Sequence, residues 1–121
     1  MYHAAGVAIP VFALRSENGF GVGEFPDLKV LADWARQTNL SVLQILPIND
    51  TTANYTWTDS YPYAAISVYA LHPQYLSIDQ LEYSLPKDLV KEYTTKKEEL
   101  NALSLIDYEQ MISGKWKFVK A

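Results

Sequence analysis

The chain has 121 residues and a formal net charge of −4, and 49% of its residues are hydrophobic. This composition indicates an ordered globular chain, and the acidic balance gives no electrostatic basis for nucleic-acid binding. There is no cysteine, so disulfides and thiolate metal sites are excluded, and the two histidines, His3 and His72, are too few and too far apart for a convincing zinc site.

Membrane and export signals are also missing from the sequence. No apolar run approaches the roughly 18 residues that a membrane span needs. The first residues lack the basic region and the apolar core of a signal peptide. These features predict a soluble, cytoplasmic protein that uses no membrane or nucleic-acid partner.

The first part of the chain predicts a strand, a helix and a second strand. Residues 6–14 are a short apolar run, and residues 41–46 are another, so both are expected to be buried strands. Residues 26–39 predict a helix, and Trp34 beside its apolar stripe is expected in the core. Strand, helix and strand over about 40 residues form a βαβ unit, which implies a parallel sheet. The apolar stripe of the helix consists of Leu28, Leu31, Ala32 and Ala35.

A glycine-rich turn lies between the first strand and the helix. Gly19, Gly21 and Gly23 alternate, which is not the spacing of a dinucleotide-binding loop, and no Lys-Ser/Thr pair follows them. The turn is therefore expected to be structural, with a positive φ angle or close backbone packing.

A long polar and aromatic loop follows Pro47 at the end of the second strand. Loops at strand ends of a β/α scaffold commonly carry binding sites. Aromatic rings offer flat apolar faces to a sugar ring, and carboxylates and hydroxyls bind its OH groups. The alternative is a solvated loop whose tyrosines pin it to the core. The loop carries Tyr55, Trp57, Asp59, Ser60, Tyr61 and Tyr63.

The last part of the chain predicts helices. Residues 64–71 are expected to form short helical turns, and residues 87–103 a charged helix with a solvated face. A second helix is expected over residues 107–120, with Asp107 as N-cap and Gln110 at the capping-box position. These helices predict an insertion subdomain over residues 81–121, after a βαβ domain over residues 1–80.

Several short motifs in this chain are similar to one enzyme family. They are QILP at 44–47, YPY at 61–63, SVYALHP at 67–73, GVGEF at 21–25, LADWA at 31–35 and LIDY at 105–108. In this order and spacing they resemble the 4-α-glucanotransferases (amylomaltases or disproportionating enzymes) of glycoside hydrolase family 77, over roughly residues 6–119. The common Ser-Pro-Tyr-Ser element reads Tyr61-Pro62-Tyr63-Ala64 here, which looks more like the branch of the plant cytosolic disproportionating enzyme.

The resemblance implies a (β/α)8 barrel, which needs about 250 residues. The chain is therefore expected to be the opening portion of a TIM barrel, with two parallel strands, a crossover helix and a C-terminal helical insertion. The family transfers α-1,4-glucan segments in starch, glycogen or maltose metabolism, by a retaining double displacement that needs no cofactor. The resemblance implies that the aspartate nucleophile and glutamate acid/base lie beyond Ala121, so the chain alone is expected to be inactive. Asp50 and Asp59 share a loop, but their spacing does not establish a catalytic pair.

The resemblance also implies which residues contact the substrate. Tyr63 stands at the position of the family's tyrosine that packs on the transferred glucose ring. The alternative is that Tyr63 only anchors the loop. Trp57, Asp59, Ser60 and Tyr61 are further candidates for lining the glucan groove, whereas His72 is expected to be structural. The expected partners are an α-1,4-glucan or maltooligosaccharide and the remainder of the barrel, with self-association also possible. The alternative function is a stand-alone glucan-binding or interaction domain without catalysis.

Overall fold

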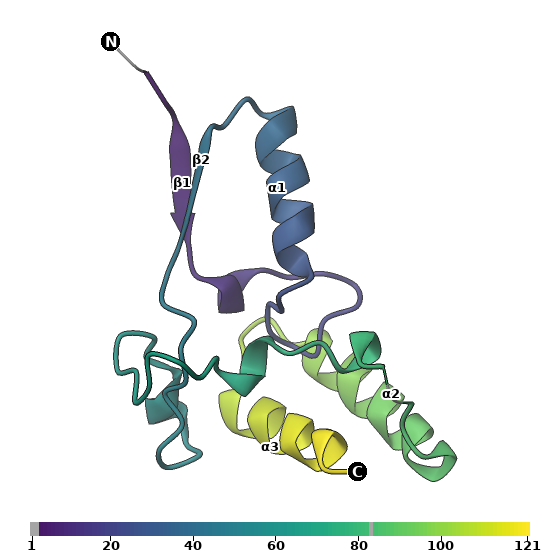
Figure 1. Ribbon diagram of the computed structural model, residues 1–121. Coiled ribbons are helices and arrows are strands. Elements are labelled where there is room, and N and C mark those ends of the chain that lie inside the picture. Colours follow the sequence, from purple (N-terminus) through teal and green to yellow (C-terminus); the bar gives the residue numbers. More distant parts are fainter. Residues whose placement is uncertain (1–2, 83) are drawn as a thin grey trace.

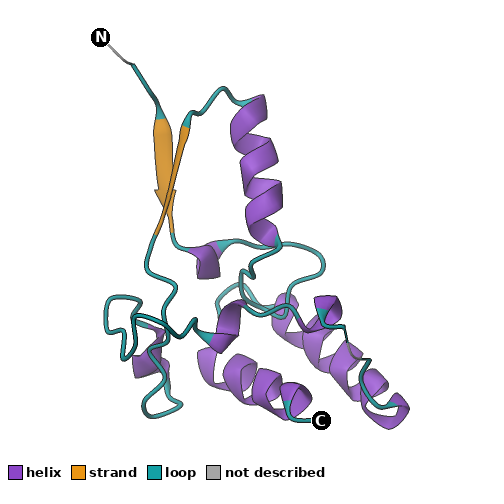
Figure 2. Ribbon diagram, viewed as in Figure 1, coloured by secondary structure: helices purple, strands orange, loops and turns teal. Residues whose placement is uncertain are grey.

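The computed structural model describes residues 3–82 and 84–121 and has two parts (Figure 1). One part consists of strand β1 (Gly6–Ile9), helix α1 (Asp27–Gln37) and strand β2 (Val42–Ile45). The other part contains helices α2 (Lys87–Asn101) and α3 (Tyr108–Val119). We call these parts the βαβ arm and the helical body. Figure 2 shows that both strands lie in the arm, away from α2 and α3.

The βαβ arm has the predicted topology. β1 and β2 pair in parallel, with Gly6 opposite Val42 and Ile9 opposite Ile45. The helix that joins them is one to two residues shorter at each end than predicted, and Asn39 (φ 57°) reverses the chain after its last turn. The α/β class and the parallel pair are therefore confirmed.

Three expectations about the arm are wrong. Both strands were expected to be buried, but their residues are exposed or half-buried, because the sheet has only two strands. β1 ends at Ile9 instead of Leu14, because Pro10 has no N–H for the ladder and a short 3₁₀ helix, η1 (Val11–Ala13), begins after it. Trp34 was expected in the core, but it is 45% exposed. It lies at the flank of the α1 stripe, where Leu31 and Ala35 are the buried residues, and the two-stranded sheet does not cover it.

The main apolar core lies in the helical body. The ring of Phe20 stacks on that of Tyr93 at 5.5 Å between centroids, and Tyr93 meets Phe118 edge-on at 5.2 Å. The cluster joins the glycine-rich turn to α2 and α3, so it includes residues on both sides of residue 80. The division into a domain over residues 1–80 and a subdomain over residues 81–121 stays a prediction. Its buried members are Phe20, Val22, Ile78, Tyr93, Leu100, Tyr108, Met111, Ile112 and Phe118.

The glycine-rich turn is structural, as expected. Gly21 has φ 77°, and a Cβ there would lie 2.8 Å from the Cβ of Leu100. Arg15 donates to the carbonyl of Gly21 at 2.7 Å, and the Asn101 side chain donates to the carbonyl of Ser16 at 2.8 Å. The turn is thus closely packed on the end of α2, and only glycine fits at position 21 without strain.

Residues 64–71 do not form the predicted helical turns. The hydroxyl of Ser67 accepts hydrogen bonds from the backbone N–H groups of Tyr69 and Ala70, both at 3.1 Å, so it offers these groups a partner other than a helical carbonyl. The segment instead returns toward β2, where Asn49 and Leu71 form an antiparallel bridge.

Both long helices near the C-terminus are confirmed. The Asp107 carboxylate accepts from the Gln110 backbone N–H at 3.0 Å, as an N-cap should. The Gln110 side chain donates to the same carboxylate at 2.9 Å, which differs from a capping box, where it would bind the backbone N–H of Asp107. In the part of the chain that the structure describes, no helix has the length and apolar character that a membrane crossing requires.

Candidate functional site

The segment after β2, residues 47–72, is a closed loop that we call the aromatic loop. Its two ends are joined by backbone hydrogen bonds, from Asp50 N to Ala70 O at 2.9 Å and from His72 N to Ile48 O at 3.0 Å. Loops of this kind, with adjacent ends and internal packing, form compact surface units. The loop includes one short 3₁₀ helix, η2 (Trp57–Ser60), which carries three of the five predicted site residues.

Asp59 anchors the aromatic loop from inside. Its carboxylate accepts backbone N–H groups from Ala53, Asn54 and Tyr55 at 3.0, 2.8 and 2.7 Å, and the residue is only 4% exposed. Burial raises the pKa of Asp59, but these three hydrogen bonds together outweigh it and leave the pKa below its usual range. Tyr55 has φ 58°, a costly conformation for a tyrosine, which this anchor helps to maintain.

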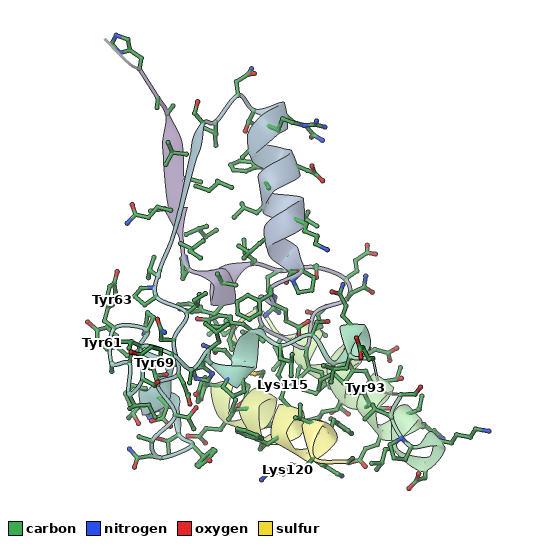
Figure 3. The ribbon with its side chains drawn as sticks, in the orientation of Figure 1. Tyr61, Tyr63, Tyr69, Tyr93, Lys115 and Lys120 are labelled. Carbon is green, nitrogen blue, oxygen red and sulfur yellow. The ribbon has the colours of Figure 1, made fainter. Side chains whose placement is uncertain are left out.

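The aromatic side chains of the same loop face outward. Trp57, Tyr61 and Tyr63 are 70%, 60% and 62% exposed. The rings of Tyr61 and Tyr63 lie 5.6 Å apart at 53°, around the buried Pro62. Figure 3 shows them at the outer edge of the loop, together with Tyr69. Tyr69 was not predicted as a site residue, although an aromatic residue between Val68 and Ala70 in a loop was a usable signal.

A cavity of about 670 Å³ lies between the aromatic loop and the start of α3. Trp57 and Ser60 line one wall, and the backbone N–H of Trp57 donates to Oε1 of Glu109 at 3.2 Å. This volume is typical of small-molecule sites. The remaining wall was not predicted. It includes the LIDY motif at 105–108, but this motif is far from the aromatic loop in sequence, so its place beside the loop could not be inferred. This wall consists of Phe12, Gln74, Leu103, Ser104, Leu105, Ile106, Asp107, Tyr108 and Glu109.

The five predicted residues therefore occupy three different places. Trp57 and Ser60 line the cavity, and Tyr61 and Tyr63 form an exposed pair at the edge of the loop. Asp59 is turned inward, with its carboxylate occupied by backbone N–H groups.

His72 closes the loop on the helical body. It is 2% exposed, its Nδ1 accepts from Gln74 N at 3.1 Å, and its Nε2 lies 2.9 Å from the Tyr108 hydroxyl. Burial lowers the pKa of His72. Because Nδ1 accepts, the neutral ring carries its proton on Nε2 and donates to Tyr108. Its contacts are structural, as expected.

Acidic residues of the loop do not converge on a metal or reaction centre. Asp50 accepts the Thr52 N–H at 2.9 Å, and Asp59 is committed to its own loop. Over residues 3–82 and 84–121, no group of three or more His, Cys, Asp or Glu side chains is arranged to hold a metal ion.

Comparison with known proteins identifies the family. Residues 9–121 match the family described as 4-alpha-glucanotransferase, glycoside hydrolase family 77, and the chain belongs to this family. The predicted resemblance is thus confirmed.

Individual relatives agree with the family assignment. The chain is 45% identical over 114 residues to 4-alpha-glucanotransferase DPE2 of Oryza sativa subsp. japonica, covering 94% of this chain and 12% of the relative. It is 35% identical over 115 residues to the 4-alpha-glucanotransferase of Chlamydia caviae and 36% identical over 115 residues to that of Chlamydia muridarum. Each of these two alignments covers 95% of this chain and 21% of the relative. The chain therefore spans about one eighth to one fifth of the length of these relatives.

Proposed function

We propose that this chain is the opening part of a 4-α-glucanotransferase catalytic barrel, and that its aromatic loop binds the α-1,4-glucan. The observation that carries the proposal is the position of the loop. It follows β2 of a βαβ unit in a member of this family, and exposes Trp57, Tyr61 and Tyr63 while Asp59 fixes its backbone. Rigid support combined with exposed rings is what recognition of a sugar face requires.

The family resemblance implies the proposed residue roles, and these positions support them. Tyr63 packs its ring on the glucose unit being transferred, with Tyr61 beside it. Trp57 and Ser60 contact a further part of the glucan at the cavity. Asp59 contributes through the shape of the loop, since its carboxylate already accepts three hydrogen bonds.

The proposed reaction is a retaining double displacement. A carboxylate attacks the anomeric carbon while a carboxylic acid protonates the departing glycosidic oxygen, so that a glucosyl-enzyme forms. The 4-hydroxyl of an acceptor sugar then attacks this intermediate and gives its proton to the second carboxylate. In this proposal both carboxylates belong to sequence outside these 121 residues, and the reaction needs no cofactor.

The proposed macromolecular partner is the remainder of the barrel. β1 and β2 each have one edge without a partner strand in the described chain, and Val42 and Ile45 are 48% and 36% exposed. Open edges and exposed apolar side chains favour further strand pairing. Without such a partner, the isolated chain is expected to associate with itself. A cytoplasmic location is part of the same proposal.

A second candidate is a stand-alone glucan-binding domain without catalysis. The helical body favours it, because this part has its own apolar cluster and holds the aromatic loop without help from the open sheet.

Two assays on the purified 121-residue protein test these proposals. Titration with maltoheptaose, followed by NMR, is expected to give saturable shifts at Trp57 and Tyr63, and their absence would contradict glucan binding. Transfer of glucosyl units from maltotriose to glycogen is expected to be undetectable. Measurable transfer would show that the catalytic groups are within the chain.

The matched control for the titration is a second exposed tryptophan. Trp34 on α1 is 45% exposed and lies outside the loop, so Trp34→Leu should leave the maltoheptaose affinity unchanged while Trp57→Leu weakens it.

A further inference from the structure

A buried lysine lies at the centre of the helical body. Lys115 of α3 is 1% exposed, and its Nζ donates to Oε1 of Glu24 at 2.6 Å and to the carbonyl of Leu76 at 2.7 Å. It also donates to the carbonyl of Gln74, so all three of its N–H groups are occupied. Figure 3 shows Lys115 on the inner side of α3.

Stability alone does not explain this ion pair. Burial lowers the pKa of Lys115 and raises the pKa of Glu24, because both charges have lost water. Apolar residues of similar shape often replace such a buried pair without loss of stability. Another pair from α3, between Lys117 and Glu92, lies at the surface with both side chains about half exposed.

The carbonyls that Lys115 binds belong to the segment that ends the aromatic loop. Gln74 lies in the 3₁₀ helix η3 (Pro73–Tyr75), and Leu76 follows it. The N–H of Gln74 donates to Nδ1 of His72, whose Nε2 lies 2.9 Å from the hydroxyl of Tyr108. Tyr108 and Lys115 are both on α3, at the i, i+7 spacing that shares one helix face. α3 therefore binds residues 72–76 at two points.

The position of residues 72–76 also determines the position of the base of the aromatic loop. The N–H of His72 donates to the carbonyl of Ile48 at 3.0 Å, so a shift of residues 72–76 displaces the point where the loop leaves β2. At the far side, the N–H of Trp57 is held by Glu109, also from α3.

We infer that Lys115 is a positioning residue for the glucan-binding surface, holding residues 74–76 on α3 so that the aromatic loop keeps the orientation of its exposed rings. The effect on glucan affinity rests on the function proposed above. The effect on the loop itself does not depend on it.

Three variants distinguish two roles of Lys115: holding residues 74–76 in position, and neutralising the buried charge of Glu24. Lys115→Met leaves the Glu24 carboxylate buried without its partner, and it is expected to lower the urea unfolding midpoint. The double variant Lys115→Met with Glu24→Met removes both charges, and it is expected to regain most of that midpoint. Lys117→Met is the control, since it makes the same substitution on the exposed side of α3.

Hydrogen exchange of the loop amides gives the direct readout. The relevant N–H groups are those of Ala53, Asn54 and Tyr55, which donate to Asp59, and that of Gln74. In the double variant the carbonyls of residues 74 and 76 still lack a donor, so these amides should exchange about tenfold faster than in the wild type. Maltoheptaose affinity should fall by about the same factor. Wild-type exchange and affinity in a stable double variant would overturn the inference.

Tyr108→Phe provides an independent test with the buried charges intact. It removes only the hydroxyl that meets His72, so the fold should persist while the exchange of the Gln74 amide and the loop amides increases. If the Gln74 amide exchanges faster but the amides of Ala53, Asn54 and Tyr55 do not, movement of residues 72–76 does not reach the loop. That result would overturn the inference, even where the double variant does not fold. A wild-type protein that does not bind maltoheptaose would contradict the proposed function, while the exchange rates would still decide the role of Lys115.

Discussion

The βαβ arm and the helical body differ in how completely they bury their apolar residues. In the arm, Leu31 and Ala35 of α1 are buried, whereas Val42 and Trp34 are nearly half exposed. In the body, nine buried side chains form one continuous cluster. The aromatic loop follows the arm in sequence, yet Glu109 and Tyr108 of the body hold it. Chain order therefore does not reveal which part supports the candidate site.

The largest expected effect comes from the core of the body. Met111 is fully buried, so Met111→Ala should lower the free energy of unfolding by about 2–5 kcal/mol. Val42→Ala in the arm should cost less than about 1 kcal/mol, since the side chain is already half exposed. Urea unfolding measures both. Equal losses would contradict the difference between the two parts.

Gly21→Ala tests the contact between the glycine-rich turn and α2. The substitution combines a positive φ with a Cβ 2.8 Å from that of Leu100, so it should destabilise the fold by about 1–3 kcal/mol. Asn18→Ala, at an exposed position beside the same turn, is the control. A Gly21→Ala protein as stable as this control would show that the turn can move away from α2.

Asp59→Asn tests the anchor of the aromatic loop. The neutral amide loses the charge that strengthens three backbone hydrogen bonds, so a loss of about 1–2 kcal/mol is expected at neutral pH. Asp33→Asn, on the exposed surface of α1, should be near neutral. If the two variants unfold at the same urea concentration, the carboxylate is not needed for the loop.

A smaller effect is expected from pH. Burial lowers the pKa of His72 in the folded protein, so the unfolded chain binds this proton more readily. The stability that the fold has with a neutral His72 ring is fully present above the pKa of His72 in the unfolded chain, about 6.5. It is lost as the pH falls toward the pKa of His72 in the folded protein. His72→Gln should flatten the fall in the urea midpoint between pH 7.5 and pH 5.5, whereas His3→Gln should not. Identical slopes for wild type and His72→Gln would contradict the burial of a neutral ring.

Local sequence signals were sufficient to locate the long helices and both strands, but not to give the end of β1 or the packing of the elements. The apolar spacing of α1, the Asp107 cap of α3 and the apolar run of β2 each depend on neighbouring residues, and all three predicted the observed elements. The exposure of Trp34 depends instead on how wide the sheet is, which no local pattern records.

The candidate site was predictable only in its exposed part. The aromatic loop was located from its residues and from the family motifs. The inward turn of Asp59 depends on how the loop closes, and the second wall of the cavity comes from residues 103–109, far along the chain. The Lys115–Glu24 pair also joins residues that are distant in sequence, so spacing gave no sign of it.

The most direct test of the central claim is the maltoheptaose affinity of two Tyr63 variants, measured by calorimetry. If this ring packs on a glucose unit, Tyr63→Phe should retain most of the affinity and Tyr63→Ala should lose about tenfold, while both keep the wild-type urea midpoint. Equal affinity of Tyr63→Ala and wild type would contradict the account.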